Sequence, residues 1–180
     1  MTEAFSHIPN YTTDDYERWE GDWELWGGHP VSMSPSPSAK HQRVAGRLFV
    51  ALGGSLGQQD GCHCETFYEI DWRISKETVV RPDLMVVCEP VDTTWIEVTP
   101  ALIVEVLSPG TASNDLKYKR ELYAAKGVKY YLIVDPGAKT IEALALDGDA
   151  YAPMHAGGES LSFDLHDGCA VSLDVAGVWA

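Results

Sequence analysis

The stretch Ala101-Leu102-Ile103-Val104-Glu105-Val106-Leu107 decides the fold class of this chain. Its only charge is Glu105, and a nearly continuous apolar run of this kind is typical of a central strand covered on both faces. A loop over 108–113 leads into a predicted helix over 114–126, which Gly127 closes, and a second apolar run follows at 130–134. This strand–helix–strand order predicts two parallel strands joined by a right-handed crossover.

The rest of the chain predicts further elements around this unit. Ser38 is a candidate cap for a helix that carries Val44, Ala45, Leu48 and Leu52 at helical spacing and ends at Gly53-Gly54. Other expected elements are a helical turn at 14–19, a hairpin of 23–26 with 31–33, strands at 64–70 and 79–87, and an antiparallel extension from Lys139 onward. We therefore expect one domain over 1–180, with an α/β (α+β) fold: a mixed central sheet flanked by helices, with antiparallel β extensions.

Composition limits the class of protein. A chain of 180 residues that is 45% apolar is long enough for one sizeable core and too apolar to be disordered. The longest apolar runs are far shorter than a membrane span, and residues 1–10 do not resemble a signal peptide. The expected location is the cytoplasm, with no membrane partner.

Four cysteines, Cys62, Cys64, Cys88 and Cys169, are expected to be reduced thiols, because nothing in the sequence indicates secretion. The sequence Cys62-His63-Cys64 contains residue types that bind zinc. We expect half-buried strand residues instead, because common zinc sites use a wider spacing and a second ligand pair, which the sequence does not show.

The net charge is −14, from 27 acidic and 13 basic residues. Affinity for nucleic acid comes mostly from Lys and Arg contacts with phosphates, so this composition argues against a general DNA binder. Any role on DNA must depend on metal bridging or on a local site, for which the candidate basic residues are Lys40, Arg43, Arg47, Lys117, Lys119 and Arg120.

Glu105 is the most informative residue for function. A carboxylate inside a buried strand costs several kcal/mol unless it is paired, protonated or bound to a metal. Strand alternation places Ile103 and Leu107 on the face of Glu105, and Val104 and Val106 on the other face. One carboxylate thus projects from an apolar strand near its C-terminal end, where function concentrates in such sheets.

Asp83, directly after Pro82, is the natural partner of Glu105. If the two strands are neighbours, both carboxylates enter one cleft, and a Mg²⁺ or Mn²⁺ ion would relieve their repulsion. Taken alone, Asp83 is equally well explained as a turn carboxylate after proline.

Lys119 is the third candidate. Asp115, Lys119 and Tyr123 share one face of the predicted helix, and the simplest account is an exposed Asp–Lys pair. A helix packed over its own strand could instead bring the ammonium group of Lys119 near the two carboxylates, where it would orient the water or stabilise a pentavalent phosphate.

These segments carry a resemblance to a known family. From about Tyr16 to the C-terminus, the chain resembles the Uma-type restriction endonuclease family of the PD-(D/E)XK nuclease superfamily. The resemblance is carried by a helix that opens at His41 and by the order and spacing of the segments 81–84, 101–109, 115–123 and 127–136. The resemblance implies a restriction-endonuclease-like fold and a divalent metal held by Asp83, Glu105 and the backbone carbonyl of Val106. The usual lysine, two residues after the glutamate, is Leu107 here, and Lys119 resembles the migrated lysine of the family.

The resulting prediction is a Mg²⁺- or Mn²⁺-dependent DNA endonuclease with Asp83, Glu105 and Lys119 as catalytic residues. His41, Asp115 and Lys117 are possible cleft residues, although a histidine near a helix start is more often a packed or capping residue. A homodimer would suit the cutting of both strands. The alternative is a non-catalytic domain of the same fold that acts as a protein-interaction or ligand-binding module. A phosphate-loop enzyme finds no support, because the G-x-x-x-x-G-K-[ST] motif is absent.

Overall fold

A six-stranded mixed sheet lies between two long helices in the computed structural model, which describes residues 9–33, 36–108, 112–154, 160–166 and 168–180, with side chains except at 112–115. The sheet order is β10-β9-β8-β7-β6-β3, and β7 and β8 are its parallel pair. The strands are β3 (Glu65–Tyr68), β6 (Leu84–Val87), β7 (Leu102–Val106), β8 (Tyr130–Asp135), β9 (Thr140–Asp147) and β10 (Ala150–Pro153). The predicted strand–helix–strand unit is therefore confirmed, with α3 (Ala112–Ala125) as its crossover.

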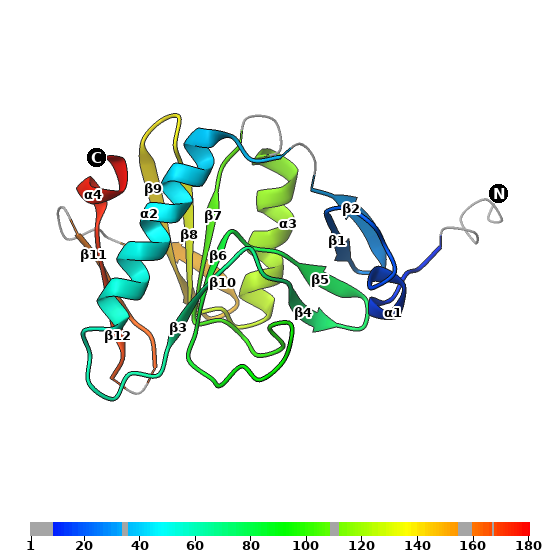
Figure 1. Ribbon diagram of the computed structural model, residues 1–180, viewed down its shortest axis with the longest axis horizontal. Coiled ribbons are helices and arrows are strands. Elements are labelled where there is room, and N and C mark those ends of the chain that lie inside the picture. The colour runs from blue at the N-terminus through cyan, green and yellow to red at the C-terminus, as the bar shows by residue number, and fades with distance from the viewer. Residues whose placement is uncertain (1–8, 34–35, 109–111, 155–159, 167) are drawn as a thin grey trace.

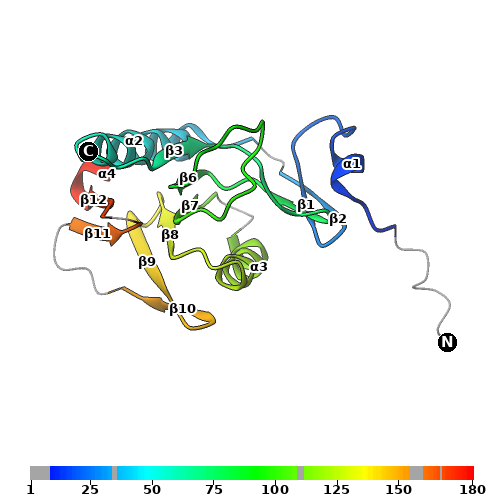
Figure 2. The same cartoon turned by 90° about the horizontal axis from the view of Figure 1, so that it is seen from below.

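The two long helices cover opposite faces of this sheet (Figure 2). Helix α2 (Ala39–Leu56) packs Leu48 and Leu52 against the face that carries Val104, whereas α3 packs Tyr123 against the face that carries Ile103. The alternation along β7 thus separates two cores, as the sequence predicted. No helix among the described residues is both long and apolar enough to cross a membrane.

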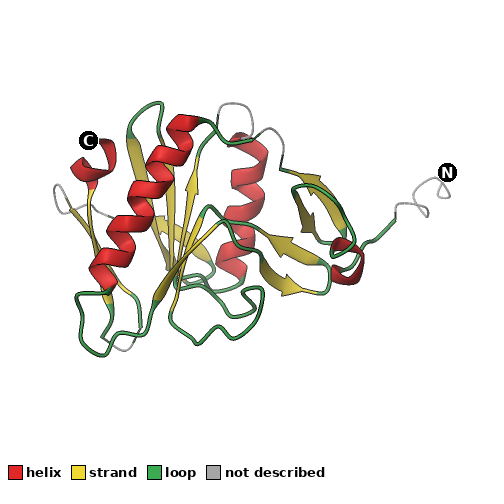
Figure 3. Cartoon of the chain, in the orientation of Figure 1, coloured by secondary structure: helices red, strands yellow, loops and turns green. Residues whose placement is uncertain are grey.

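A smaller sheet of order β2-β1-β5-β4 stands beside the central one (Figure 3). Its strands are β1 (Trp23–Trp26), β2 (His29–Ser32), β4 (Trp72–Ser75) and β5 (Thr78–Val80), and α1 (Thr13–Tyr16) precedes them. The predicted hairpin is confirmed as β1–β2. The remaining elements are a separate hairpin of β11 (Ser160–Asp164) and β12 (Ala170–Asp174), and α4 (Val175–Trp179).

Three expectations about elements were wrong. The expected strand over 79–87 is two strands in different sheets, because Pro82 has no N–H to donate to a ladder and the chain changes sheets there. Gly53-Gly54 does not end α2, since Leu48, Leu52 and Leu56 continue one buried face past the glycines. The C-terminal region extends the central sheet only through β9 and β10, because β11 and β12 pair with each other.

The expectation of reduced cysteines was also wrong for this structure. Cys62 is joined to Cys169 and Cys64 to Cys88 in disulfides, with Cα–Cα separations of 5.2 and 3.8 Å. The sequence could not reveal these pairs because the fold brings their partners together from distant segments.

Leu132 lies on β8, in the core that α2 forms with the central sheet, and is fully buried. Leu132→Ala is expected to lower the free energy of unfolding by about 2–5 kcal/mol, because it leaves a cavity in a close-packed interior. Chemical denaturation measures the loss. Val50→Ala on α2, where the side chain is 70% exposed, is the control and should change stability by no more than about 0.5 kcal/mol; equal effects of the two substitutions would contradict this packing.

Candidate active site

Asp83 and Glu105 lie opposite each other on neighbouring strands. In the antiparallel pair of β6 and β7, Leu84 faces Val104, so Asp83, directly before β6, falls beside Glu105. The backbone N–H of Val106 donates to Asp83 Oδ2 at 2.6 Å. Asp83, Glu105 and Val106 all line one cleft of about 620 Å³. The fold thus brings together the three residues that the resemblance implied as metal ligands.

Lys119 is buried between two glutamates rather than exposed. Its Nζ lies 3.0 Å from Glu105 Oε1 and 3.0 Å from Glu24 Oε1, and the residue is only 8% exposed. Tyr123, one turn further along α3, donates to the same Glu105 oxygen at 2.7 Å. The simpler account of Lys119 as half of an exposed pair with Asp115 is therefore wrong for the lysine, while the Asp115 side chain lies outside the described residues.

Glu24 on β1 belongs to this cluster and was missed by the sequence analysis. It is 3% exposed, and its carboxylate also accepts from the Arg81 backbone N–H at 2.7 Å and from Trp26 Nε1 at 2.8 Å. The signal was available: Glu24 is the single charge in the apolar strand Trp23-Glu24-Leu25-Trp26, the same pattern that singled out Glu105. The cluster therefore joins the small sheet to the central sheet and α3.

Burial and charge set the protonation of this cluster. Burial raises the pKa of Glu105 to about 7; nearby Lys119 opposes the shift, and the Asp83 and Glu24 carboxylates add to it. Although burial alone would lower it, Glu105 and Glu24 hold the pKa of Lys119 well above its ordinary value. Lys119 is therefore a permanent positive charge rather than a proton carrier at neutral pH.

The free energy of unfolding of the metal-free protein is expected to fall by on the order of 2 kcal/mol as the pH rises from about 5 to about 8. The reason is that the pKa of Glu105 is raised in the folded protein, so that folding favours the protonated carboxyl group. The stabilisation by protonated Glu105 is fully present below the ordinary pKa of a glutamate and is lost as the pH rises through about 7. Urea denaturation in EDTA across this range measures it. Glu105→Gln should flatten the profile, and a profile unchanged in this variant would contradict the assignment.

His41, on the first turn of α2, is also in the cleft. Its Nε2 lies 3.3 Å from Asp83 Oδ2, and its side chain is 5% exposed. Burial lowers the pKa of His41, but the Asp83 carboxylate and the Val106 backbone outweigh this effect and leave it raised. Nδ1 is buried without a hydrogen-bond partner among the described residues. His41 is thus both packed and cleft-lining, two possibilities that the sequence analysis treated as alternatives.

The other candidates are placed differently. Leu107, at the usual lysine position, lines the cleft and contributes no charge. Lys117 is exposed on α3 and is not among the residues that line the cleft. The ammonium group of Lys119 therefore supplies the buried positive charge at Glu105.

Comparisons with known proteins agree with this architecture. The family profile Uma2, described as "Putative restriction endonuclease", matches residues 13–176. An uncharacterized protein from Synechocystis is 30% identical over 145 residues, which cover 75% of this chain and 74% of that protein. The crystal structure described as that of "a putative nuclease belonging to DUF820" from Anabaena variabilis matches with a TM-score of 0.73 and 14% identity, over 93% of this chain and 97% of that one. At this identity the likeness shows the fold alone, which is restriction-endonuclease-like.

Proposed function

This chain belongs to the Uma2 family, and from that premise we propose that it is a divalent-metal-dependent DNA endonuclease. Family and fold indicate a nuclease; the metal, the substrate and the roles of the residues are our proposal. The observation that carries it is the convergence of Asp83 and Glu105 on one cleft, beside a buried and permanently charged lysine.

The donor atoms fit a hard divalent cation. Asp83 uses Oδ2 and Glu105 uses Oε1 for protein contacts, and no described residue bonds to the second oxygen of either carboxylate. The carboxylates of Asp83, Glu105 and Glu24 all line the cleft, and Lys119 pairs with the last two, so a cation would reduce an excess of negative charge. Carboxylate and carbonyl oxygens suit Mg²⁺ and Mn²⁺.

The carboxylates alone do not form a complete ligand set. In the described part of the chain, the one group of three His, Cys, Asp or Glu ligand atoms within 4.8 Å of one another is made of cysteine sulfurs. A site on Asp83, Glu105 and the Val106 carbonyl would therefore leave positions for water, as is common for Mg²⁺. A bound ion of this kind would lower the pKa of its water and stabilise charge on a phosphate.

The protein groups around the carboxylates have separable tasks. Tyr123 and Lys119 fix Glu105 Oε1, and the Val106 N–H and His41 fix Asp83 Oδ2, so each carboxylate is oriented before any ligand binds. Pre-organised groups of this kind need no rearrangement during the reaction. Lys119 would place a fixed positive charge beside the negative charge that develops on the phosphate.

DNA binding would rest on a local basic surface, because the net charge is −14. Lys40 and Arg43 are exposed on the first turns of α2, next to the cleft residue His41. Positive charge confined to one face can still guide a polyanion to a cleft.

The double variant Lys40→Gln/Arg43→Gln is expected to weaken DNA binding roughly 10-fold and to reduce the slope of log K against log salt by about 1–2. Fluorescence anisotropy with a labelled duplex, in Ca²⁺ to prevent cleavage, measures both. Lys76→Gln/Lys126→Gln makes the same charge change at exposed positions whose neighbours in the chain do not line the cleft, and it should leave the slope unchanged. If both double variants change the salt dependence equally, the DNA-binding surface does not lie at Lys40 and Arg43.

Nicking of supercoiled plasmid by the purified protein tests the proposed activity. Expected are relaxed products in Mg²⁺ or Mn²⁺, none in EDTA, and none from Glu105→Gln. Absence of nicking with every metal, or nicking that survives in EDTA or in the variant, would contradict the proposal. Single-stranded DNA and RNA in parallel reactions define the substrate class.

A second candidate, a non-catalytic interaction module, is favoured by one observation. Lys119 already neutralises much of the charge of Glu24 and Glu105, so the cluster could serve only to hold the small sheet on the central one. In that case Mn²⁺ calorimetry would show no binding. A single domain, a homodimer and a cytoplasmic location remain predictions, and sedimentation analysis measures the oligomeric state.

A further inference from the structure

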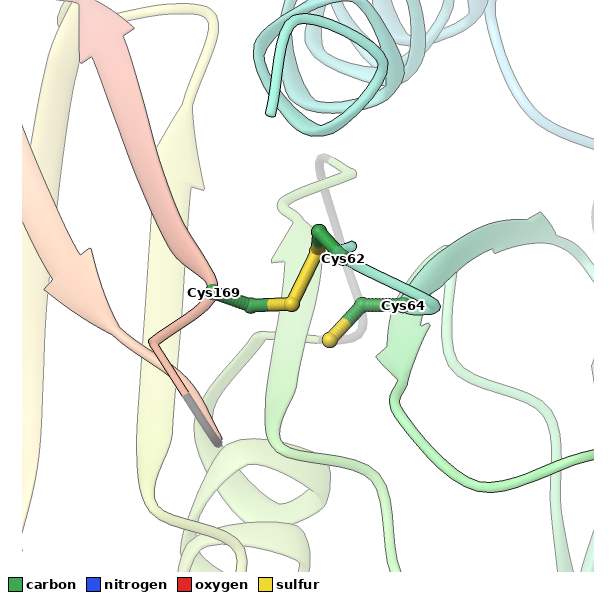
Figure 4. Close-up of side chains that lie close together, drawn as sticks. All are labelled: Cys62, Cys64 and Cys169. Carbon is green, nitrogen blue, oxygen red and sulfur yellow. A yellow bond between two sulfur atoms is a disulfide. The ribbon is translucent and has the colours of Figure 1, made fainter. Parts of the chain in front are cut away.

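The four cysteines of the chain meet at one place, away from the cleft. Cys62 and Cys64 lie between α2 and β3, Cys88 directly follows β6, and Cys169 directly precedes β12. Because Asp83 precedes β6 and Cys88 follows it, the cleft and the cysteines lie at opposite ends of this strand. The sulfur of Cys64 faces the Cys62–Cys169 disulfide in Figure 4.

The two disulfides lie against each other. The sulfur atoms of Cys62, Cys64 and Cys169 are all within 4.8 Å of one another, although Cys64 is bonded to neither of the other two. Cys88 is bonded to Cys64, so its sulfur lies beside this group of three, although it is not within 4.8 Å of every member. Two independent disulfides do not need to be adjacent, whereas a single metal ion requires all four sulfurs around one point.

From this arrangement, we propose that the reduced protein binds one Zn²⁺ ion through the thiolates of Cys62, Cys64, Cys88 and Cys169. A tetrahedral zinc ion with Zn–S bonds of about 2.3 Å places its sulfurs about 3.8 Å apart, which is inside the 4.8 Å limit that encloses the sulfurs of Cys62, Cys64 and Cys169. Sequence spacing argued against zinc because Cys62-His63-Cys64 had no second ligand pair. The fold supplies that pair as Cys88 and Cys169.

Contacts that do not involve sulfur hold these positions, so the thiols stay together after reduction. The register of β3 and β6 pairs Glu65 with Val87, which places Cys64 opposite Cys88. The Cys62 N–H donates to the Gln59 carbonyl at 3.3 Å, and the Ala170 N–H donates to Gln59 Oε1 at 2.8 Å. Gln59 thus ties the segment of Cys62 to that of Cys169.

The disulfide and zinc forms are alternatives for the same atoms. Two equivalents of a small thiol reduce each S–S bond, giving two cysteine thiols and one oxidised small disulfide. Zinc binding then displaces the four thiol protons, which leave to solvent. The ion would join the α2–β3 segment, β6 and the β11–β12 hairpin, and its binding energy would stabilise the folded chain.

Anaerobic titration of the reduced full-length protein with Co²⁺, and then with Zn²⁺, tests this site. Expected are a sulfur-to-cobalt charge-transfer band and tetrahedral d–d bands that saturate at one Co²⁺ per chain, and their loss when Zn²⁺ displaces Co²⁺. Cys62→Ala should weaken Co²⁺ binding by at least about 100-fold. Asp83→Asn should keep the full thiolate spectrum, which separates this site from any ion in the cleft.

A second readout does not depend on the folding of a cysteine variant. One equivalent of Zn²⁺ should protect all four cysteines of the wild-type chain from alkylation, as measured by mass spectrometry, and should raise its melting temperature. Absence of the charge-transfer band, alkylation at an unchanged rate in Zn²⁺, or a spectrum unaltered by Cys62→Ala would overturn the proposal and leave two disulfides as the only role of these residues.

Discussion

Replacing Asp83 with asparagine is expected to abolish Mn²⁺ binding and to reduce plasmid nicking by on the order of 10³-fold. The amide keeps the size of the side chain and can still accept the Val106 N–H bond, which is 2.6 Å long in the native protein. It lacks the anionic oxygen that a hard cation requires. Calorimetry measures the binding and gel electrophoresis of plasmid measures the nicking, both on the same preparation.

The matched control for this substitution is Asp22→Asn. Asp22 lines the same cleft, but its side chain is 76% exposed and pairs with Arg81 at 3.0 Å. The control makes the same change of charge and shape, and it should retain Mn²⁺ binding and most of the nicking. Thermal melting should show that Asp83→Asn remains folded. Equal losses in the two variants, or nicking by Asp83→Asn at the wild-type rate, would refute the role of Asp83.

Replacing Lys119 with methionine is expected to lower the free energy of unfolding by about 3–5 kcal/mol and to abolish nicking. The methionine fills a similar volume but leaves Glu24 and Glu105 buried without the cation that now lies 3.0 Å from each. Chemical denaturation at pH 8 measures the loss. Part of it should be regained at lower pH, where the carboxylates are protonated, and in Mg²⁺ if the ion binds Glu105.

Lys117→Met provides the matched control on the same helix. Lys117 is exposed and lies outside the cleft lining, so this variant should lose no more than about 0.5 kcal/mol and should still nick DNA. Lys119→Arg keeps the positive charge but changes the shape of the side chain, so it separates the effect of charge from that of packing. If the two methionine variants were equally stable and active, the buried ion cluster would have neither role.

The central sheet could be predicted because its strands are local patterns. An apolar run of seven residues around Glu105 and the following helix and strand define β7, α3 and β8 without any knowledge of distant contacts. The sequence analysis missed α4 and also β4 of the smaller sheet, whose four residues Trp72-Arg73-Ile74-Ser75 are too few and too mixed to form a distinctive run. Short edge elements take their structure from the strand beside them, here β5.

The site could be predicted only in part. Asp83 and Glu105 could be predicted as site residues from the strand pattern and the family resemblance. The ion pair of Glu24 with Lys119 could not, because it depends on how the small sheet packs against α3. The same limit applies to the cysteines. Cys62-His63-Cys64 is visible in the sequence, whereas its meeting with Cys88 and Cys169 is a property of the folded chain.

Anomalous diffraction from crystals of the wild-type protein grown with Mn²⁺ is the most direct test of the central claim that Asp83 and Glu105 hold a divalent metal. The account predicts one strong manganese peak in the cleft, within bonding distance of a carboxylate oxygen of each residue and of the Val106 carbonyl. An empty cleft at saturating Mn²⁺, with Lys119 still bridging Glu24 and Glu105, would contradict the account and leave the non-catalytic interpretation.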